Sequence, residues 1–140
     1  MDYHHLTAPC GIDCFNCQLF AGNAETPARL ALNRLQPRFA GVLCRSCRAQ
    51  NCALLESPCP TRQCAADHQV GFCFECAEFP CTRLAPMADQ AARVPHNLKV
   101  YNLCRIKAVG VESWAATEAQ ANRNRYFNGR FQIGAGPQTS

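Results

Sequence analysis

The distribution of cysteines constrains this chain of 140 residues more than any other feature. Twelve cysteines are present, and three pairs of them have the C-x2-C spacing. A two-residue gap lets both sulfurs of a tight turn face one ion, and thiolate is a favoured ligand of zinc and of iron–sulfur clusters. Eleven cysteines are clustered: Cys10, Cys14, Cys17, Cys44, Cys47, Cys52, Cys59, Cys64, Cys73, Cys76 and Cys81. We predict that these eleven side chains bind metal.

The supply of large apolar side chains in the same segment is small. Residues 10–81 contain 16 residues of Val, Ile, Leu, Met, Phe, Trp or Tyr among 72. A core of this size usually needs staples, either disulfides or metal ions. The composition therefore predicts a small, irregular, mostly α fold that is stapled by metal, with short helices around a cysteine-rich zinc-binding core.

The first residues of the chain indicate whether disulfides or metal ions stabilise the cysteine-rich segment. The chain starts Met-Asp-Tyr-His-His-Leu, without the charged and apolar regions of a secretory signal, and no stretch approaches about 18 apolar residues. We therefore expect a cytoplasmic protein without membrane contact, in which thiols stay reduced and clustered cysteines hold metal. The even number of cysteines also permits a disulfide framework, which the absent export signal disfavours.

The division of the cysteines among sites stays open at this stage. A structural zinc site takes four ligands, so eleven cysteines supply two complete sites with three thiols left over. Either His68 or Cys104 would complete a third site, although Cys104 lies in a predicted helix and is expected to be a free, buried thiol. Several pairings fit the spacing, among them Cys44-x2-Cys47 with Cys73-x2-Cys76, and Cys14-x2-Cys17 with Cys44-x2-Cys47.

An iron–sulfur cluster is the main alternative to zinc. The Cys10-x3-Cys14-x2-Cys17 spacing is that of the radical S-adenosylmethionine motif, but that enzyme class needs a long barrel domain which 140 residues cannot supply. The ferredoxin spacing C-x2-C-x2-C-x3-C-P is also absent. These observations favour zinc.

The chain divides into two predicted parts, a cysteine-rich metal-binding domain over residues 1–84 and a helical extension over residues 85–140. Thr26 and Pro27 predict a helix start, and the expected helices cover residues 27–36, 98–109 and 114–122, with a further short one over 87–93. Asn97 and Ser113 are the expected caps of the second and third helices. Asn128-Gly129 predicts a hairpin, and Gly134–Ser140 reads as a disordered tail.

The cysteine pattern resembles that of the DUF3795 family of small proteins without an established function. The resemblance rests on Cys10-Gly-Ile-Asp-Cys14, on Thr61-Arg-Gln-Cys64 and on the run from Phe72 to Cys81, Phe-Cys-Phe-Glu-Cys-Ala-Glu-Phe-Pro-Cys. It covers about residues 9–84 and implies a metal-binding, chiefly zinc-binding, cysteine domain without assigned catalytic residues. The six residues between Cys52 and Cys59 are a wider gap than relatives tend to have.

Three functions are compatible with these features. A metal-stapled interaction module with an unknown protein partner requires nothing beyond the cysteines. Basic and aromatic side chains are interleaved in residues 123–131, which is compatible with nucleic-acid binding. The alternative is that these aromatics are buried in a hairpin, and the net charge of +4 does not distinguish the two. An enzyme or redox protein could use Glu75 or Glu78 as a base, but no HExxH, deaminase or thioredoxin pattern is present. We favour the interaction module.

Overall fold

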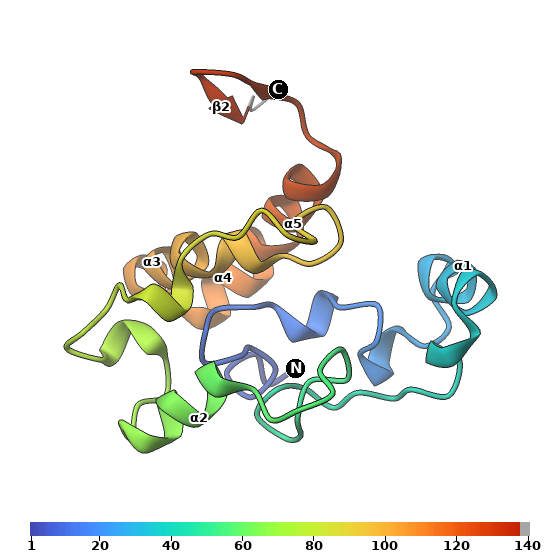
Figure 1. Ribbon diagram of the computed structural model, residues 1–140, viewed down its shortest axis with the longest axis horizontal. Helices are drawn as coiled ribbons and strands as arrows, with labels where there is room; N and C mark the ends of the chain where they lie inside the picture. Colours follow the sequence, from blue (N-terminus) through green and yellow to red (C-terminus); the bar gives the residue numbers. More distant parts are fainter. Residues whose placement is uncertain (138–140) are drawn as a thin grey trace.

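The computed structural model describes residues 1–137, in which short helices are joined by long loops (Figure 1). The α-helices are α1 (Pro27–Leu35), α2 (Pro60–Asp67), α3 (Lys99–Val109), α4 (Val111–Thr117) and α5 (Ala119–Asn128). Single 3-10 turns cover Cys14–Asn16, Ala21–Asn23, Pro37–Phe39, Cys73–Glu75, Thr82–Leu84 and His96–Leu98. The prediction of a small, mostly helical, cysteine-rich chain is confirmed.

Helix α1 starts where the sequence predicts but buries an unexpected side chain. Thr26 is the N-cap, and its hydroxyl oxygen accepts a hydrogen bond from the Arg29 backbone N–H at 3.2 Å. The charged Arg29 is 1% exposed, whereas the apolar Leu35 is 81% exposed. Its guanidinium donates to the carbonyls of Gln18, Phe39 and Val42, and these bonds tie α1 to the loops on either side. Burial of Arg29 is possible because its donors are satisfied by backbone oxygens.

Two local features in the middle of the chain differ from the sequence-based expectation. Pro60 occupies the first helical position after Cys59 and begins α2, a helix that is not among those predicted. Pro at that position is pre-organised for a helix and needs no N–H partner. Conversely, residues 87–93 form turns instead of the expected helix.

The second half of the chain is helical, with boundaries that partly differ from the prediction. Helix α3 ends at Gly110 as expected, where φ is +83°. Asn97 does not cap α3, because its side-chain amide exchanges hydrogen bonds with the backbone of Met87. Ser113 is no cap either, since α4 already begins at Val111, directly after the glycine.

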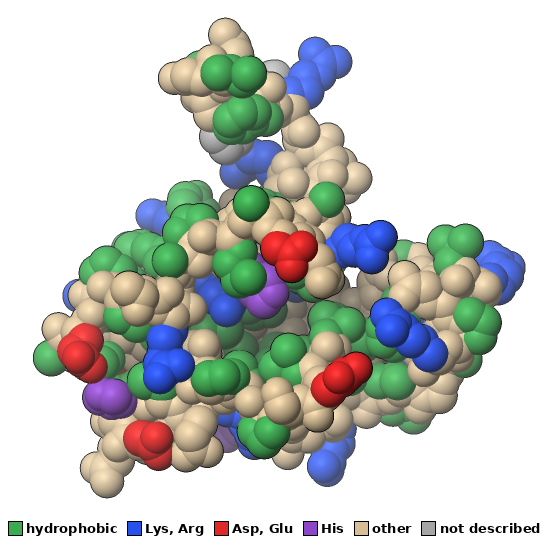
Figure 2. Space-filling view, viewed as in Figure 1, with side chains coloured by type: hydrophobic (Ala, Val, Ile, Leu, Met, Phe, Trp, Pro, Cys, Tyr) green, Lys and Arg blue, Asp and Glu red, His purple; other side chains and the backbone are tan. Residues whose placement is uncertain are grey.

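The predicted hairpin at Asn128-Gly129 is wrong, because Asn128 is the last residue of α5. Beyond it, within the residues that the structure describes, β1 (Phe131–Gln132) and β2 (Gly136–Pro137) pair antiparallel. Figure 2 shows this end of the chain standing clear of the body. Phe131 and Ile133 are 73% and 92% exposed, so these aromatic and aliphatic groups are not buried on the cysteine region. Of the tail predicted to be disordered, residues 138–140 lie outside the described part of the chain.

One hydrophobic core joins residues from both ends of the chain. Trp114 and Leu103 are each 0% exposed and pack with Phe15 and Phe72, which belong to the cysteine region. The Trp114 and Phe15 rings meet edge to face at 6.1 Å. Figure 1 shows the N-terminal segment passing below α3 and α4, while α1 lies apart at one end. Across residues 1–137 the helices are too short or too polar to cross a lipid bilayer.

The loop between Cys10 and Cys14 lies directly against α3. Gly11 has φ of +86°, and a Cβ atom there would lie 3.0 Å from both the Leu103 side chain and the Lys99 carbonyl oxygen. The Asn102 side chain donates to the Gly11 carbonyl oxygen at 2.9 Å. A glycine is therefore needed at this position both for its backbone conformation and for close approach of the helix.

Replacing Gly11 by alanine is expected to lower the free energy of unfolding by about 1–3 kcal/mol, because a strained φ and an overpacked contact each have costs of that order. Urea unfolding of the Gly11→Ala variant measures this loss. Gly110→Ala is the matched control, since Gly110 has φ of +83° but no atom within 4 Å of the added Cβ. Equal losses in the two variants would show that the contact with α3 contributes nothing.

Candidate metal centre

Two of the three C-x2-C pairs form the same kind of turn. In each, a 3-10 turn begins at the first cysteine, and the N–H of the second cysteine donates to the carbonyl oxygen of the first. These bonds measure 3.0 Å for Cys17 to Cys14 and 3.2 Å for Cys76 to Cys73. The N–H of Cys73 also donates to the Pro9 carbonyl at 2.9 Å, so the second turn lies beside the loop that carries Cys10. Backbone bonds thus gather thiols that are about 60 residues apart in sequence.

The third pair is held by different contacts. Cys44 donates its N–H to the Leu19 carbonyl at 2.9 Å, which places it in a short parallel bridge next to the first turn. Ser46 has φ of +124°, and its hydroxyl donates to the His5 carbonyl oxygen at 3.0 Å. This contact orders the chain just before Cys47.

Cys14, Cys17, Cys47 and Cys52 form a first thiol group, defined by their mutual electrostatic interactions. A hydrogen bond from Cys47 lowers the pKa of Cys14, and the same donor lowers the pKa of Cys52 to about 6. The pKa of Cys47 is raised, because its thiol keeps its proton and donates hydrogen bonds to the sulfurs of Cys14 and Cys52. Burial raises the pKa of Cys17. A divalent cation in place of that proton would satisfy several sulfurs at once.

Cys10, Cys64, Cys73 and Cys81 form a second thiol group. Burial and, to a lesser extent, the neighbouring charges of Cys10, Cys81 and Cys64 raise the pKa of Cys73 to about 12. Burial likewise raises the pKa of Cys10 to about 11, against the opposing charge of Lys99. Desolvated thiols of this kind remain protonated without a cation, so metal binding at neutral pH would release their protons.

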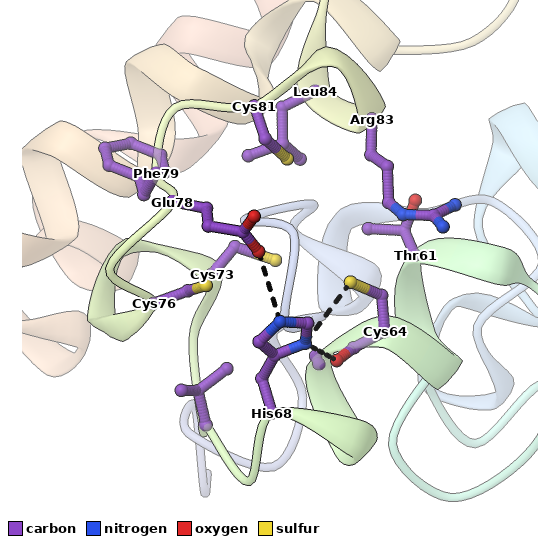
Figure 3. Close-up of a pocket in the computed structure, with 12 residues that line it drawn as sticks. Thr61, Cys64, His68, Cys73, Cys76, Glu78, Phe79, Cys81, Arg83 and Leu84 are labelled. Carbon is purple, nitrogen blue, oxygen red and sulfur yellow. Dashed lines mark hydrogen bonds and ion pairs between the residues drawn. The ribbon is translucent and has the colours of Figure 1, made fainter.

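Three members of the second thiol group, Cys64, Cys73 and Cys81, border a cavity of about 40 Å³. Figure 3 shows Cys64, Cys73, Cys76 and Cys81 around this space, with His68 entering from the end of α2 and Glu78 from the loop above. Ala65 and Leu84, which are 4% and 2% exposed, supply part of its apolar wall. This cavity therefore brings together the candidate ligand His68 and four of the eleven predicted cysteines.

Two basic side chains contact the cysteine region in different ways. Arg48 donates to the carbonyls of Thr7 and Gly71 at 2.7 and 2.6 Å and stacks on Phe72 with its guanidinium carbon 4.7 Å from the ring centroid. Arg48 therefore links the loops around the thiols, and these hydrogen bonds are part of the fold. Burial raises the pKa of Cys10, and the charge of Lys99, at the start of α3, opposes this rise. The Cys47 hydrogen bond lowers the pKa of Cys52, and the charge of Lys99 acts in the same direction.

All twelve cysteines, which lie within the described residues 1–137, are free thiols. Cys104 was expected to be buried, but it is exposed on α3 and therefore does not serve as a small core residue. Cys59 is the N-cap of α2 and interacts electrostatically with Cys10, whereas Cys44 belongs to neither thiol group. The sequence drew attention to His68 and Glu78 separately, but nothing in its spacing indicated that they meet or that Lys99 approaches the thiols.

These features define a small helical protein with a cysteine-rich centre. The sequence profile of the family described as "Protein of unknown function (DUF3795)" matches residues 6–86. That match covers more than half of the chain, so the protein belongs to the DUF3795 family. No curated protein and no solved structure matches the chain.

Proposed function

We propose that the cysteine region binds zinc in two structural sites, one in each thiol group, and that the stapled fold serves as an interaction module. The observation that supports this proposal is that eight thiols influence one another electrostatically in two sets of four. No three of these sulfurs lie within 4.8 Å of one another in residues 1–137, so an ion would have to draw each set together. Four thiolates are the complete ligand set of a structural zinc ion and leave no position for a reacting water. Of the other three predicted ligands, Cys76 lines the cavity, whereas Cys44 and Cys59 belong to neither group.

The chemistry of the two groups supports a structural role over a catalytic one. Each four-thiolate zinc site carries two formal negative charges, and two cations are close to the groups: Lys99 to both, and Arg123 to the first. Since both cations belong to the C-terminal helices, they would also attach these helices to the metal centre. Cytoplasmic location remains part of this proposal, because reduced thiols are needed for metal binding.

A protein partner is the proposed target of the module. The exposed apolar side chains of Phe131 and Ile133 on the projecting end of the chain are suited to contact with another protein. Nucleic acid is less well supported, because the Lys and Arg side chains on the face shown in Figure 2 are scattered and Arg48 is occupied by backbone carbonyls.

Elemental analysis combined with a visible absorption spectrum, on protein purified without oxygen, tests the proposal. We expect about two to three zinc ions per chain, because eleven thiols fill two sites with three left over. We also expect no visible absorption band. Iron together with acid-labile sulfide and a broad visible band would overturn zinc in favour of an iron–sulfur cluster. The absence of any bound metal would overturn both.

A further inference from the structure

Three donors of different chemistry meet at the rim of the cavity. The His68 imidazole, the Cys76 thiol and the Glu78 carboxylate each place one ligand atom within 4.8 Å of the other two. The His68 Nε2 and Glu78 Oε2 atoms are 3.2 Å apart. Within the described residues 1–137, this is the one group of three possible metal ligands that lies so close together.

The imidazole of His68 is already oriented as a ligand. Its Nδ1 lies 2.9 Å from the Cys64 carbonyl oxygen at the end of α2, and Figure 3 shows the opposite nitrogen turned towards Glu78. When Nδ1–H donates to that carbonyl, the lone pair is on Nε2 and faces the cavity. Metal-binding histidines generally have this arrangement, in which the second ring nitrogen donates to a backbone carbonyl or carboxylate.

The spacing of the three donors agrees with tetrahedral coordination. Zinc binds imidazole nitrogen and carboxylate oxygen at about 2.0–2.2 Å, which places two such ligands roughly 3.3–3.5 Å apart. The observed 3.2 Å between His68 Nε2 and Glu78 Oε2 is close to this ligand–ligand separation. The Cys76 sulfur, whose bond to zinc would be about 2.3 Å, needs to move by no more than about 1 Å to complete the set.

The charge and exposure of this group differ from those of the two thiol groups. One thiolate and one carboxylate neutralise a divalent cation, whereas four thiolates leave a surplus of negative charge. The His68 and Glu78 side chains are 43% and 73% exposed, so solvent reaches the ion. The cavity of about 40 Å³ has room for a water molecule, which needs roughly 10–15 Å³ by this measure.

We propose that His68, Cys76 and Glu78 bind a third, exchangeable zinc ion whose fourth position is open to water. Three protein ligands plus water is the arrangement of zinc sites that exchange ligands or polarise a substrate, in contrast to closed structural sites. This site rests on the proposed function in one respect: its ligand Cys76 lies in the turn that begins at Cys73, and that turn has to be folded. It gives the protein a solvent-facing zinc site in addition to its structural ions.

The test is the release of zinc to a chromogenic chelator. The zinc-loaded protein should lose one equivalent in a fast phase and its structural ions in a slow phase at least about tenfold slower, since closed sites must open first. The variants His68→Gln and Glu78→Gln should each lose the fast equivalent and keep the slow phase. Glu56→Gln and His96→Gln, which change residues that do not line the cavity, are the controls and should release zinc as the unmodified protein does.

The outcomes distinguish this inference from the proposed function. A protein without zinc contradicts the proposed function, and the third site with it. Zinc that leaves in a single slow phase, or a fast phase that persists in both variants, overturns the exchangeable site alone and leaves His68 and Glu78 as an ion pair. Glu78→Gln keeps the test valid if the His68 variant does not fold, because an exposed side chain is replaced by one of the same shape.

Discussion

A chelator in excess is expected to unfold residues 10–81 of the zinc-loaded protein. Structural zinc in small domains contributes about 10–16 kcal/mol of apparent binding free energy at neutral pH, and this energy is part of the folding free energy. A domain of this size is typically stable by only about 5–15 kcal/mol in total. Since the cysteine region has few large apolar side chains, the loss of its ions exceeds what the remaining core supplies.

Trp114 makes this prediction measurable, because it is the single tryptophan and is 0% exposed. Its ring contacts Phe15, which lies in the first cysteine turn. Near-ultraviolet circular dichroism and tryptophan fluorescence should therefore both change when the turn loses its ion, and added zinc should restore them. A chelated sample that keeps its near-ultraviolet signal and its hydrodynamic radius would contradict a metal-stapled fold.

Cysteine substitutions provide the matched controls for the chelation experiment. Cys47→Ser removes the thiol that interacts with two neighbours in the first thiol group and should reproduce the effect of the chelator. Cys104→Ser changes an exposed thiol of α3 and should leave both optical signals unchanged. Equal behaviour of the two variants would show that the response does not arise from the proposed sites.

Sequence patterns predicted the features that local chemistry determines. Thr26 and Pro27 mark the start of α1 because an N-cap oxygen and a fixed φ act within one turn of chain. Gly110 marks the end of α3 for a similar reason. The DUF3795 motifs also identified the family, since they consist of closely spaced cysteines.

Predictions that depend on distant contacts were less successful. The buried position of Arg29 depends on carbonyls of residues 18, 39 and 42, which the helical periodicity of α1 cannot reveal. Asn128 continues α5 although Asn-Gly is a strong turn signal, because the preceding residues already propagate the helix. The meeting of His68 with Glu78 depends on how α2 and the following loop fold back, which spacing does not encode.

A buried ion pair between the two halves of the chain gives the second large expected effect. Asp13 is 1% exposed, and the Arg123 side chain of α5 donates to both of its carboxylate oxygens, at 2.8 and 2.5 Å. Asp13→Asn is expected to destabilise the protein by about 3–5 kcal/mol, because it leaves the largely buried Arg123 guanidinium without its countercharge. Urea unfolding in zinc-saturated buffer measures the loss, so that metal release does not contribute.

Arg105 and Glu118 provide the matched comparison, since they form a similar two-bond pair at the surface of the C-terminal helices. Glu118→Gln should shift the unfolding midpoint far less, because water screens exposed charges. Arg123→Met should cost as much as Asp13→Asn, while the double variant should cost less than the sum, since the second change removes the charge that the first leaves unpaired. If the two losses in free energy of unfolding were strictly additive, the apolar core around Trp114 alone would hold α5 on the cysteine region. Asp13 would then not fix the loop that carries Cys10 and Cys14.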